Sequence, residues 1–255
     1  MRTVFLRSFG VRFAIAAPAD VFGELSAAFP PHAVRSGPGP AARRFFVAGE
    51  RTGHRRSFSL YGGRRLLCRS AVLGTVAEHL GRALRHAVAA RSPYALFVHA
   101  GAVGWKGCAI VVPGPSGAGK SELVNALVAG GATYYSDDLA PLDSHGRVFS
   151  YRRPLRLRQD GPGAGRCAGT LGGELAPPLP VGLIVCTRYR GDASWSPREL
   201  SAGDAALHLL ANTLPVRSRP GFSLRTLGAA ARGARAVQSE RGEAADAARE
   251  ILSLV

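Results

Sequence analysis

The chain has 255 residues, 46% of them hydrophobic, and 33 Lys and Arg against 17 Asp and Glu give a formal net charge of +16. This length and apolar content suffice for one large or two small domains with hydrophobic cores. The four cysteines lie far apart without C-x-x-C spacing, so we expect reduced thiols and no zinc site. No apolar run approaches the roughly 20 residues that a membrane span requires, which predicts a cytoplasmic protein without membrane contact.

The strong positive charge is compatible with two kinds of surface. The arginines are spread through the chain and do not interleave with aromatic residues as in known nucleic-acid-binding modules. We therefore favour a generally basic surface over a nucleic-acid groove, and an acidic or anionic acceptor would suit such a surface. Homo-oligomerisation is compatible with the sequence, which leaves the number of subunits open.

The first part of the chain predicts a small sheet followed by a helix. Gly/Pro clusters separate short β-type runs at Thr3 to Leu6, Arg12 to Ala16, Arg44 to Ala48 and Ser57 to Tyr61. Apolar residues then recur at helical spacing at Leu73, Val76, Leu80, Leu84 and Val88. We interpret residues 1–92 as an N-terminal α+β accessory domain with a connecting helix, and residues 93–255 as a second, larger domain.

Residues 114–121 read Gly-Pro-Ser-Gly-Ala-Gly-Lys-Ser, which matches the phosphate-binding pattern G-x-x-x-x-G-K-[ST]. The motif lies between an apolar run, Cys108 to Val112, and an amphipathic stretch, Glu122 to Val128, as a strand, loop and helix would. Main-chain N–H groups of such a loop, with the positive end of the following helix, bind phosphate. Lys120 can reach the β and γ phosphate oxygens, and the Ser121 hydroxyl can ligate Mg²⁺. The motif predicts ATP and Mg²⁺ as ligands.

Two glycines of the loop, Gly114 and Gly119, are expected to take backbone angles that residues with a Cβ avoid. The alternative interpretation is a glycine-rich turn that binds no ligand. The predicted nucleotide-binding residues are Gly114, Pro115, Ser116, Gly117, Ala118, Gly119, Lys120, Ser121 and Glu122.

Two adjacent acids, Asp137 and Asp138, follow a short β-type run, Ala132 to Ser136. A right-handed crossover would lay this strand parallel to the strand before the loop, so that both acids face the phosphates. One carboxylate can hold Mg²⁺ and the other can accept a proton from an attacking hydroxyl. The sequence does not say which has which role, although we group Asp138 with Ser121 as metal ligands. A turn or helix cap is the alternative role of such a pair.

Arginines in the following region are further candidates for the site. Arg156 and Arg158 alternate with leucines, so a strand there would put both on one face, to clamp a phosphate or acceptor or to lie in solvent. Arg188 follows an apolar strand, Leu183 to Cys186, and could stabilise charge on a transferred phosphoryl group. The Gly/Pro-rich stretch 160–180 predicts a mobile loop over the site.

The C-terminal part predicts helices. Ser201 and Asp204 form a capping-box pattern, and Leu207, Leu210 and Leu214 would supply the apolar face of the helix that follows. A last helix is predicted from about Glu243 to Leu254, with Ala244, Ala247, Ala248, Ile251, Leu252 and Val255 largely on one side.

Together, the loop and the acids resemble the HPr kinase/phosphorylase family, whose loop has the form G-x-S-G-x-G-K-S-E and precedes a small helix, a glycine turn and an Asp-Asp pair. Here these are residues 114–122, Gly130-Gly131 and Asp137-Asp138, and residues 99–103, His-Ala-Gly-Ala-Val, match the family's His-small-x-x-Val segment. The resemblance covers residues 95–142. It implies an α/β fold with a P-loop kinase core of the HPr-kinase type and the smaller accessory domain before it.

After Asp138 the chain lacks the Gly- and Leu-rich signature that precedes the acceptor-binding region of HPr kinase. Residues 146–158, 181–189 and 209–213 are similar instead to shorter HPr-kinase-related proteins, some of which phosphorylate a hydroxyl of a lasso peptide precursor. This similarity implies a peptide or small protein as acceptor. A small-molecule hydroxyl kinase and a nucleotide-dependent regulatory binding protein are the alternative functions.

The resemblance also implies catalytic roles for His99, Lys120, Asp137 and Asp138, with His99 orienting an aspartate. Without the family position, His99 reads equally well as a hydrogen-bonded core residue. Glu122 matches the family's Lys-Ser-Glu, yet a glutamate in the first turn of a helix is also favoured by the helix dipole.

Overall fold

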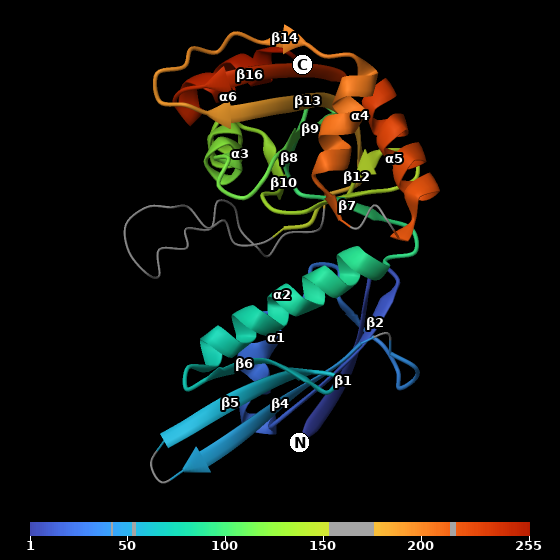
Figure 1. Ribbon diagram of the computed structural model, residues 1–255, viewed down its shortest axis with the longest axis vertical. Coiled ribbons are helices and arrows are strands. Elements are labelled where there is room, and N and C mark those ends of the chain that lie inside the picture. Colours follow the sequence, from blue (N-terminus) through green and yellow to red (C-terminus); the bar gives the residue numbers. More distant parts are fainter. Residues whose placement is uncertain (42, 53–54, 153–175, 215–217) are drawn as a thin grey trace. The chain divides into compact units, whose positions relative to one another are not determined.

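The computed structural model describes residues 1–255 except 42, 53–54, 153–175 and 215–217 (Figure 1). Its described residues form a mixed α/β protein with two mixed β-sheets and six α-helices. The chain divides into two compact units, Met1–Tyr94 and Ala95–Val255. Each unit contains one of the sheets and its own buried apolar residues, so each is described by itself. The predictions for Arg156, Arg158 and most of the stretch 160–180 lie outside the described residues.

Among the helices that the structure describes, none is both long enough and apolar enough to cross a membrane.

The first unit contains a six-stranded sheet in the order β3-β1-β2-β4-β5-β6, antiparallel except for the parallel pair β2 and β4. Its strands are β1 (Arg2–Ser8), β2 (Val11–Ala17), β3 (Val34–Arg35), β4 (Arg43–Thr52), β5 (Arg55–Gly62) and β6 (Arg65–Ser70). Its helical elements are η1 (Ala19–Val21), α1 (Phe22–Ser26) and α2 (Leu73–Arg91). The four predicted strands and the predicted helix are confirmed, whereas β3 and β6 were not predicted.

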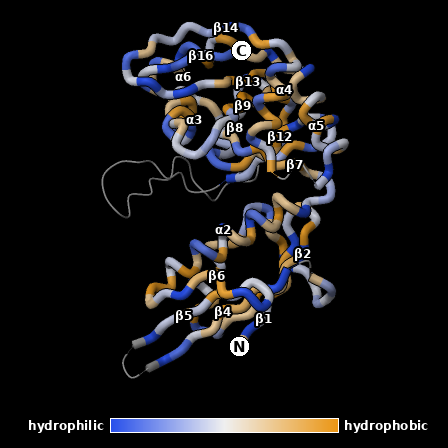
Figure 2. The backbone as a smooth tube through the Cα atoms, in the orientation of Figure 1, coloured by the Kyte–Doolittle hydropathy of each residue, from blue (hydrophilic) through white to orange (hydrophobic). Residues whose placement is uncertain are grey.

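Helix α2 owes its position to one apolar stripe. Val76, Leu80, Leu84 and Val88 recur at steps of four and are completely buried, which is the pattern of a helix that packs by one face. Figure 2 shows hydrophobic and hydrophilic residues alternating along this helix. The helix contacts β2, β5 and β6 of its own unit.

The second unit is built on a larger mixed sheet. Its strands are β7 (Leu96–Val98), β8 (Ala100–Trp105), β9 (Cys108–Pro113), β10 (Thr133–Ser136), β11 (Ala140–Leu142), β12 (Arg147–Val148), β13 (Leu179–Tyr189), β14 (Arg198–Glu199), β15 (Thr213–Leu214) and β16 (Arg235–Arg241). Its helices are α3 (Lys120–Ala129), α4 (Ala202–Ala211), α5 (Pro220–Arg232) and α6 (Ala244–Ser253).

At the centre of this sheet, β9, β13 and β16 are parallel to one another, with β13 in the middle. Strand β8 is antiparallel to both β9 and β10, so β10 runs in the same direction as β9. The predicted strand after the loop is therefore parallel to the strand before it, with β8 between them. As a result, the carboxyl ends of β9, β10, β13 and β16 meet at one edge of the sheet.

Helices cover both faces of the sheet. Helices α3 and α6 contact each other on one face, and α4 and α5 contact each other on the other (Figure 1). Successive residues of β9 pack on opposite sides: Ile110 and Val112 join the core under α3 and α6, and Ala109 and Val111 join the core under α4 and α5. A strand buried on both faces reads as a continuous apolar run, as this one does.

The helices after β13 match the sequence in part. The Ser201 Oγ accepts a hydrogen bond of 3.1 Å from the Asp204 N–H, which confirms the predicted cap. The predicted apolar face of this helix is confirmed for Leu210, which packs against the core. It is wrong for Leu207, which is 62% exposed, and for Leu214, which lies beyond the helix in β15. The buried residues of α4 are Ala205 and Leu209. The apolar side of the last helix is confirmed by the buried residues of α6, which are Ala247, Ala248, Ile251 and Leu252.

Three cysteines lie in the described residues, and all are free thiols. Cys186 is buried in β13, and burial raises the pKa of its thiol to about 12. Cys68 and Cys108 are partly buried, and burial also raises the pKa of Cys108. Cys167 lies outside the described part of the chain. The thiols of Cys108 and Cys186 therefore stay protonated more readily than that of an exposed cysteine.

Gly101 in β8 allows α3 to lie close to the sheet, since a Cβ at this position would lie 2.5 Å from the Cγ2 of Val124. We expect Gly101→Ala to lower the free energy of unfolding by about 1–3 kcal/mol through overpacking, as measured by denaturant unfolding. Gly203→Ala is the matched control, because its added Cβ would make only an ordinary contact of 3.6 Å with the Ser201 Oγ. Equal stability of Gly101→Ala and the unchanged protein would contradict this account.

Candidate functional site

Residues 114–119 connect the carboxyl end of β9 to α3. Gly117 and Gly119 have φ angles of 85° and 78°, in the left-handed region that glycine enters without steric cost. The prediction for Gly114 was wrong, since its φ is not positive and an added Cβ would make only ordinary contacts of 3.5 Å or more. The two left-handed residues turn the chain directly before the first turn of α3, for which Gly119 is the N-cap.

The Lys120 side chain lies inside the loop. Only 7% of the residue is exposed, and its Nζ donates hydrogen bonds of 2.8 Å to the carbonyl oxygens of Gly114 and Pro115. Burial lowers the pKa of Lys120, although the nearby carboxylates of Asp138, Asp137 and Glu122 act in the opposite direction. The loop therefore holds a buried ammonium close to its own main chain.

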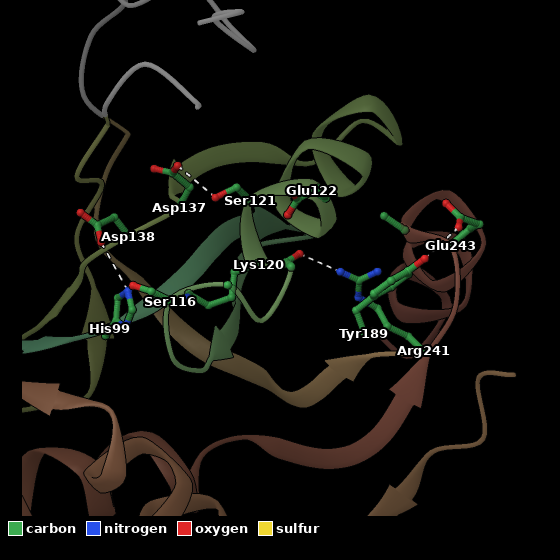
Figure 3. A pocket seen from close by; sticks show the side chains of 13 residues that line it. His99, Ser116, Lys120, Ser121, Glu122, Asp137, Asp138, Tyr189, Arg241 and Glu243 are labelled. Carbon is green, nitrogen blue, oxygen red and sulfur yellow. Dashed lines mark hydrogen bonds and ion pairs between the residues drawn. The ribbon is translucent and has the colours of Figure 1, made fainter. Parts of the chain in front are cut away.

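The two aspartates at the end of β10 point to different partners (Figure 3). The Asp137 Oδ2 accepts a hydrogen bond of 3.4 Å from the Ser121 hydroxyl, and its Oδ1 accepts one of 2.9 Å from the Tyr134 hydroxyl. The Asp138 Oδ1 lies 3.5 Å from the Nε2 of His99. The carboxylate beside Ser121 is thus that of Asp137, not that of Asp138 with which we had grouped it. Both aspartates lie in a bend directly after β10, where the Ser136 Oγ accepts hydrogen bonds from the N–H groups of Asp138 and Leu139.

His99 lies between β7 and β8, where main-chain hydrogen bonds connect this segment to the phosphate-binding loop and to Asp138. Its N–H donates to the Asn212 carbonyl at 2.6 Å, and its carbonyl accepts from the N–H of Gly114 at 3.3 Å. The next N–H, of Ala100, donates to the Asp138 carbonyl at 3.2 Å. The side chain of His99 is 23% exposed, faces Asp138 and lines the cavity described below.

A cavity of about 570 Å³ lies at the edge where the four carboxyl ends meet. Most of the predicted residues line it, but Gly114, Pro115 and Ala118 do not. The lining residues are His99, Ser116, Gly117, Gly119, Lys120, Ser121, Glu122, Asp137, Asp138, Tyr189, Arg241, Glu243 and Ala244. The last four were not predicted from the sequence.

The structure does not bring Arg188 into this cavity. Side chains alternate along β13, so Arg188 and Tyr189 face opposite sides of the sheet, and it is Tyr189 that lines the cavity. The arginine that does line it is Arg241, the last residue of β16. No motif marks Arg241, and residues 235–241, Arg-Ala-Val-Gln-Ser-Glu-Arg, show no apolar–polar alternation that would indicate a strand ending at this place.

Arg241 is almost completely buried, with 2% of the residue exposed. Its Nη2 donates a hydrogen bond of 2.7 Å to the carbonyl of Gly119, and its Nη1 donates one of 2.9 Å to the carbonyl of Gly242. Its guanidinium carbon lies 5.4 Å from the centroid of the Tyr189 ring. Burial lowers the pKa of Arg241, while Glu122, Glu243 and Tyr189 raise it. This second buried cation fixes the end of the loop to β16.

The charges of the cavity favour a divalent cation with any polyphosphate. Two cationic side chains and four carboxylates line it, so a polyphosphate alone would meet excess negative charge. No cluster of three or more His, Cys, Asp or Glu that could hold a metal occurs within the described ranges. The Ser121 hydroxyl and the Asp137 carboxylate offer the hard oxygen ligands that Mg²⁺ prefers, and Mg²⁺ commonly takes its other ligands from substrate phosphates and water. The residues present therefore fit Mg²⁺.

Comparison with models of protein families gives no match for this chain, and comparison with curated proteins gives no significant match.

The lowered pKa of Lys120 leads to a testable pH dependence. In the free protein its ammonium loses its proton below pH 10.5, the value of an ordinary lysine. A neutral amine does not attract phosphate, so the affinity for inorganic tripolyphosphate should fall as the pH rises through this lowered pKa. Titration calorimetry from neutral pH to pH 10.5 measures the effect.

Lys120→Arg is the control for this titration, because its guanidinium stays charged throughout. A wild-type affinity that is constant over this range, or an equal fall in Lys120→Arg, would contradict the assignment of Lys120 as the phosphate-binding cation.

Proposed function

We propose that this chain is an ATP-dependent kinase that transfers the γ-phosphoryl group to a serine-type hydroxyl of a peptide or small protein. One observation supports the proposal best: a single cavity contains the Lys120 loop, the Ser121–Asp137 pair and the His99–Asp138 pair. A phosphate-binding loop with one acid beside a hydroxyl and another beside a histidine is suited to phosphoryl transfer. In this proposal the β9–loop–α3 unit is the P-loop core of a kinase of the HPr-kinase type.

Asp138 is the proposed catalytic base. The hydroxyl oxygen of the acceptor attacks the γ-phosphorus as the bond from that phosphorus to the β–γ bridging oxygen breaks, and ADP leaves. The proton of the hydroxyl passes to the Asp138 carboxylate. His99 is a positioning residue for this carboxylate, because its Nε2 lies 3.5 Å from the Asp138 Oδ1. Its own position is fixed by main-chain hydrogen bonds to Asn212 and Gly114.

Lys120 and the loop main chain would stabilise the negative charge of the transferred group. The lysine is already buried and held in place before any substrate binds, so little reorganisation is needed. Ser121 and Asp137 would hold Mg²⁺, which when bound neutralises charge on the β and γ phosphates. This division of roles assigns the metal to the acid beside Ser121 and leaves Asp138 for the proton.

The choice of a peptide or small protein as acceptor depends on the resemblance to HPr-kinase-related proteins. The net charge of +16 suits an acidic acceptor. A small-molecule hydroxyl and a purely regulatory use of ATP are the alternative functions.

Substitution of the two aspartates separates their roles. We expect Asp138→Asn to lower kcat by about 10²–10⁴-fold with little change in ATP affinity, since only the proton acceptor is lost. Asp137→Asn should instead raise the Mg²⁺ concentration required for half-maximal rate. Steady-state kinetics over a range of Mg²⁺ concentrations distinguish the two effects, and normal turnover by Asp138→Asn would rule out its role as base.

The positioning role of His99 predicts non-additive kinetics. His99→Asn should lower kcat by about tenfold in the unchanged protein, yet have almost no further effect in the Asp138→Asn background, because both changes disable one unit. A double-mutant cycle on kcat, with the KM for ATP as a control, measures this. Additive losses would show that His99 acts independently of Asp138.

The acceptor class can be identified by incubating the protein with γ-labelled ATP and a cell extract. The proposal predicts a labelled macromolecule whose label is stable to acid and lost in alkali, as a phosphoserine is, and no transfer by Lys120→Ala. A labelled small molecule would favour the small-molecule kinase, and free phosphate alone would favour the regulatory protein.

A further inference from the structure

If the proposed function holds, the cavity gives a bound nucleotide a direction. The acids Asp137 and Asp138 lie at one end of it, and Tyr189, Arg241 and Glu243 lie at the other, with the loop between them (Figure 3). The terminal phosphate must approach the acids for transfer to occur. The nucleoside must then extend toward the opposite end, at the carboxyl ends of β13 and β16.

This opposite end contains an aromatic side chain beside a buried cation. Tyr189 and Arg241 are paired in the register of the parallel strands β13 and β16, so they lie side by side on the same face. The guanidinium is fixed by its hydrogen bonds to Gly119 and Gly242, and its carbon lies 5.4 Å from the centroid of the ring. The tyrosine itself is 49% exposed. A fixed, half-exposed ring is a stacking surface for a nucleobase.

Arg241 is more buried and less satisfied than packing alone requires. Its Nε has no hydrogen-bond partner within the part of the chain that the structure describes, although the residue is only 2% exposed. A buried cation with an unsatisfied N–H costs free energy and calls for an explanation by function. The position of Arg241, beside Tyr189 and hydrogen-bonded to the Gly119 carbonyl, supplies one: it couples the stacking surface to the phosphate-binding turn.

A carboxylate next to the ring supplies a hydrogen-bond acceptor. The Tyr189 hydroxyl donates to the Glu243 Oε1 at 3.5 Å. Glu243 is the N-cap residue of α6 but makes no side-chain capping bond, so its carboxylate is not used to end the helix. The amino group of adenine is a donor at the position where hypoxanthine and guanine carry an oxygen acceptor. A carboxylate at this place favours the amino group and repels the oxygen.

We infer that Tyr189, Arg241 and Glu243 form the nucleoside subsite, in which the base stacks on Tyr189 and an adenine amino group donates to Glu243. This inference rests on the proposed function, because the direction of the nucleotide comes from the position of the acids. The subsite makes ATP the preferred triphosphate.

The stacking part is tested by calorimetric titration with two ligands, ATP with Mg²⁺ and inorganic tripolyphosphate with Mg²⁺. Tyr189→Ala should weaken ATP binding by about 10- to 100-fold, and Tyr189→Phe should retain most of the affinity. Neither change should alter tripolyphosphate binding, because this ligand has no base. Tyr94→Ala is the matched control, since Tyr94 is 50% exposed and does not line the cavity.

Two failures of this experiment are distinguishable. Wild-type ATP affinity in Tyr189→Ala, with normal tripolyphosphate binding, would overturn the subsite alone. Absence of tripolyphosphate binding to the unchanged protein would overturn the phosphate site and thus the proposed function.

The base-reading part is tested by competition between ATP, inosine triphosphate and GTP. The unchanged protein should bind ATP about 10- to 100-fold more tightly than the two triphosphates that carry an oxygen at this position. Glu243→Ala should remove most of this preference without loss of tripolyphosphate binding. Equal affinities in the unchanged protein, or a preference that persists in Glu243→Ala, would overturn the role of Glu243.

Discussion

The parallel register of β9, β13 and β16 is the constraint on which the site depends. These strands are buried on both faces, between α3 and α6 on one side and α4 and α5 on the other. Because they run in one direction, their carboxyl ends open at the same edge, which is where ligands bind in open α/β sheets. The loop after β9, Tyr189 at the end of β13 and Arg241 at the end of β16 therefore lie at this edge. The two acids that follow β10 lie there as well.

Two buried cations give the site its electrostatic character. Lys120 and Arg241 both donate to carbonyl oxygens of the loop, from its two ends. Burying such charges is costly unless they are hydrogen-bonded and face opposite charge. In this molecule the carboxylates of Asp137, Asp138 and Glu122 raise the pKa of the buried lysine against the effect of burial. Lys120 is then in place to meet phosphate oxygens with little rearrangement, whereas Arg241 holds the end of the loop beside Tyr189.

The sequence predicts the parts of the site that are local and leaves out those that depend on strand order. The loop motif and Asp137-Asp138 are short patterns with a physical meaning, and the strands and helix around them follow from hydrophobic periodicity. Arg241 and Tyr189 come together only through the pairing of β13 with β16, which no local pattern encodes. For the same reason, Arg188 was predicted instead of Arg241. Arg188 carries the positive charge that the site requires, but it lies on the face of β13 that points away from the cavity. The separate partners of Asp137 and Asp138 likewise become visible only with the side chains in place.

A crystal structure with Mg²⁺ and a non-hydrolysable ATP analogue tests the central claim most directly. We predict phosphates within hydrogen-bond distance of the main chain of residues 116–121, with the γ-phosphate between Lys120 and Asp138, Mg²⁺ on Ser121 and the base against Tyr189. An analogue bound elsewhere, or one whose phosphates do not contact this loop, would contradict it.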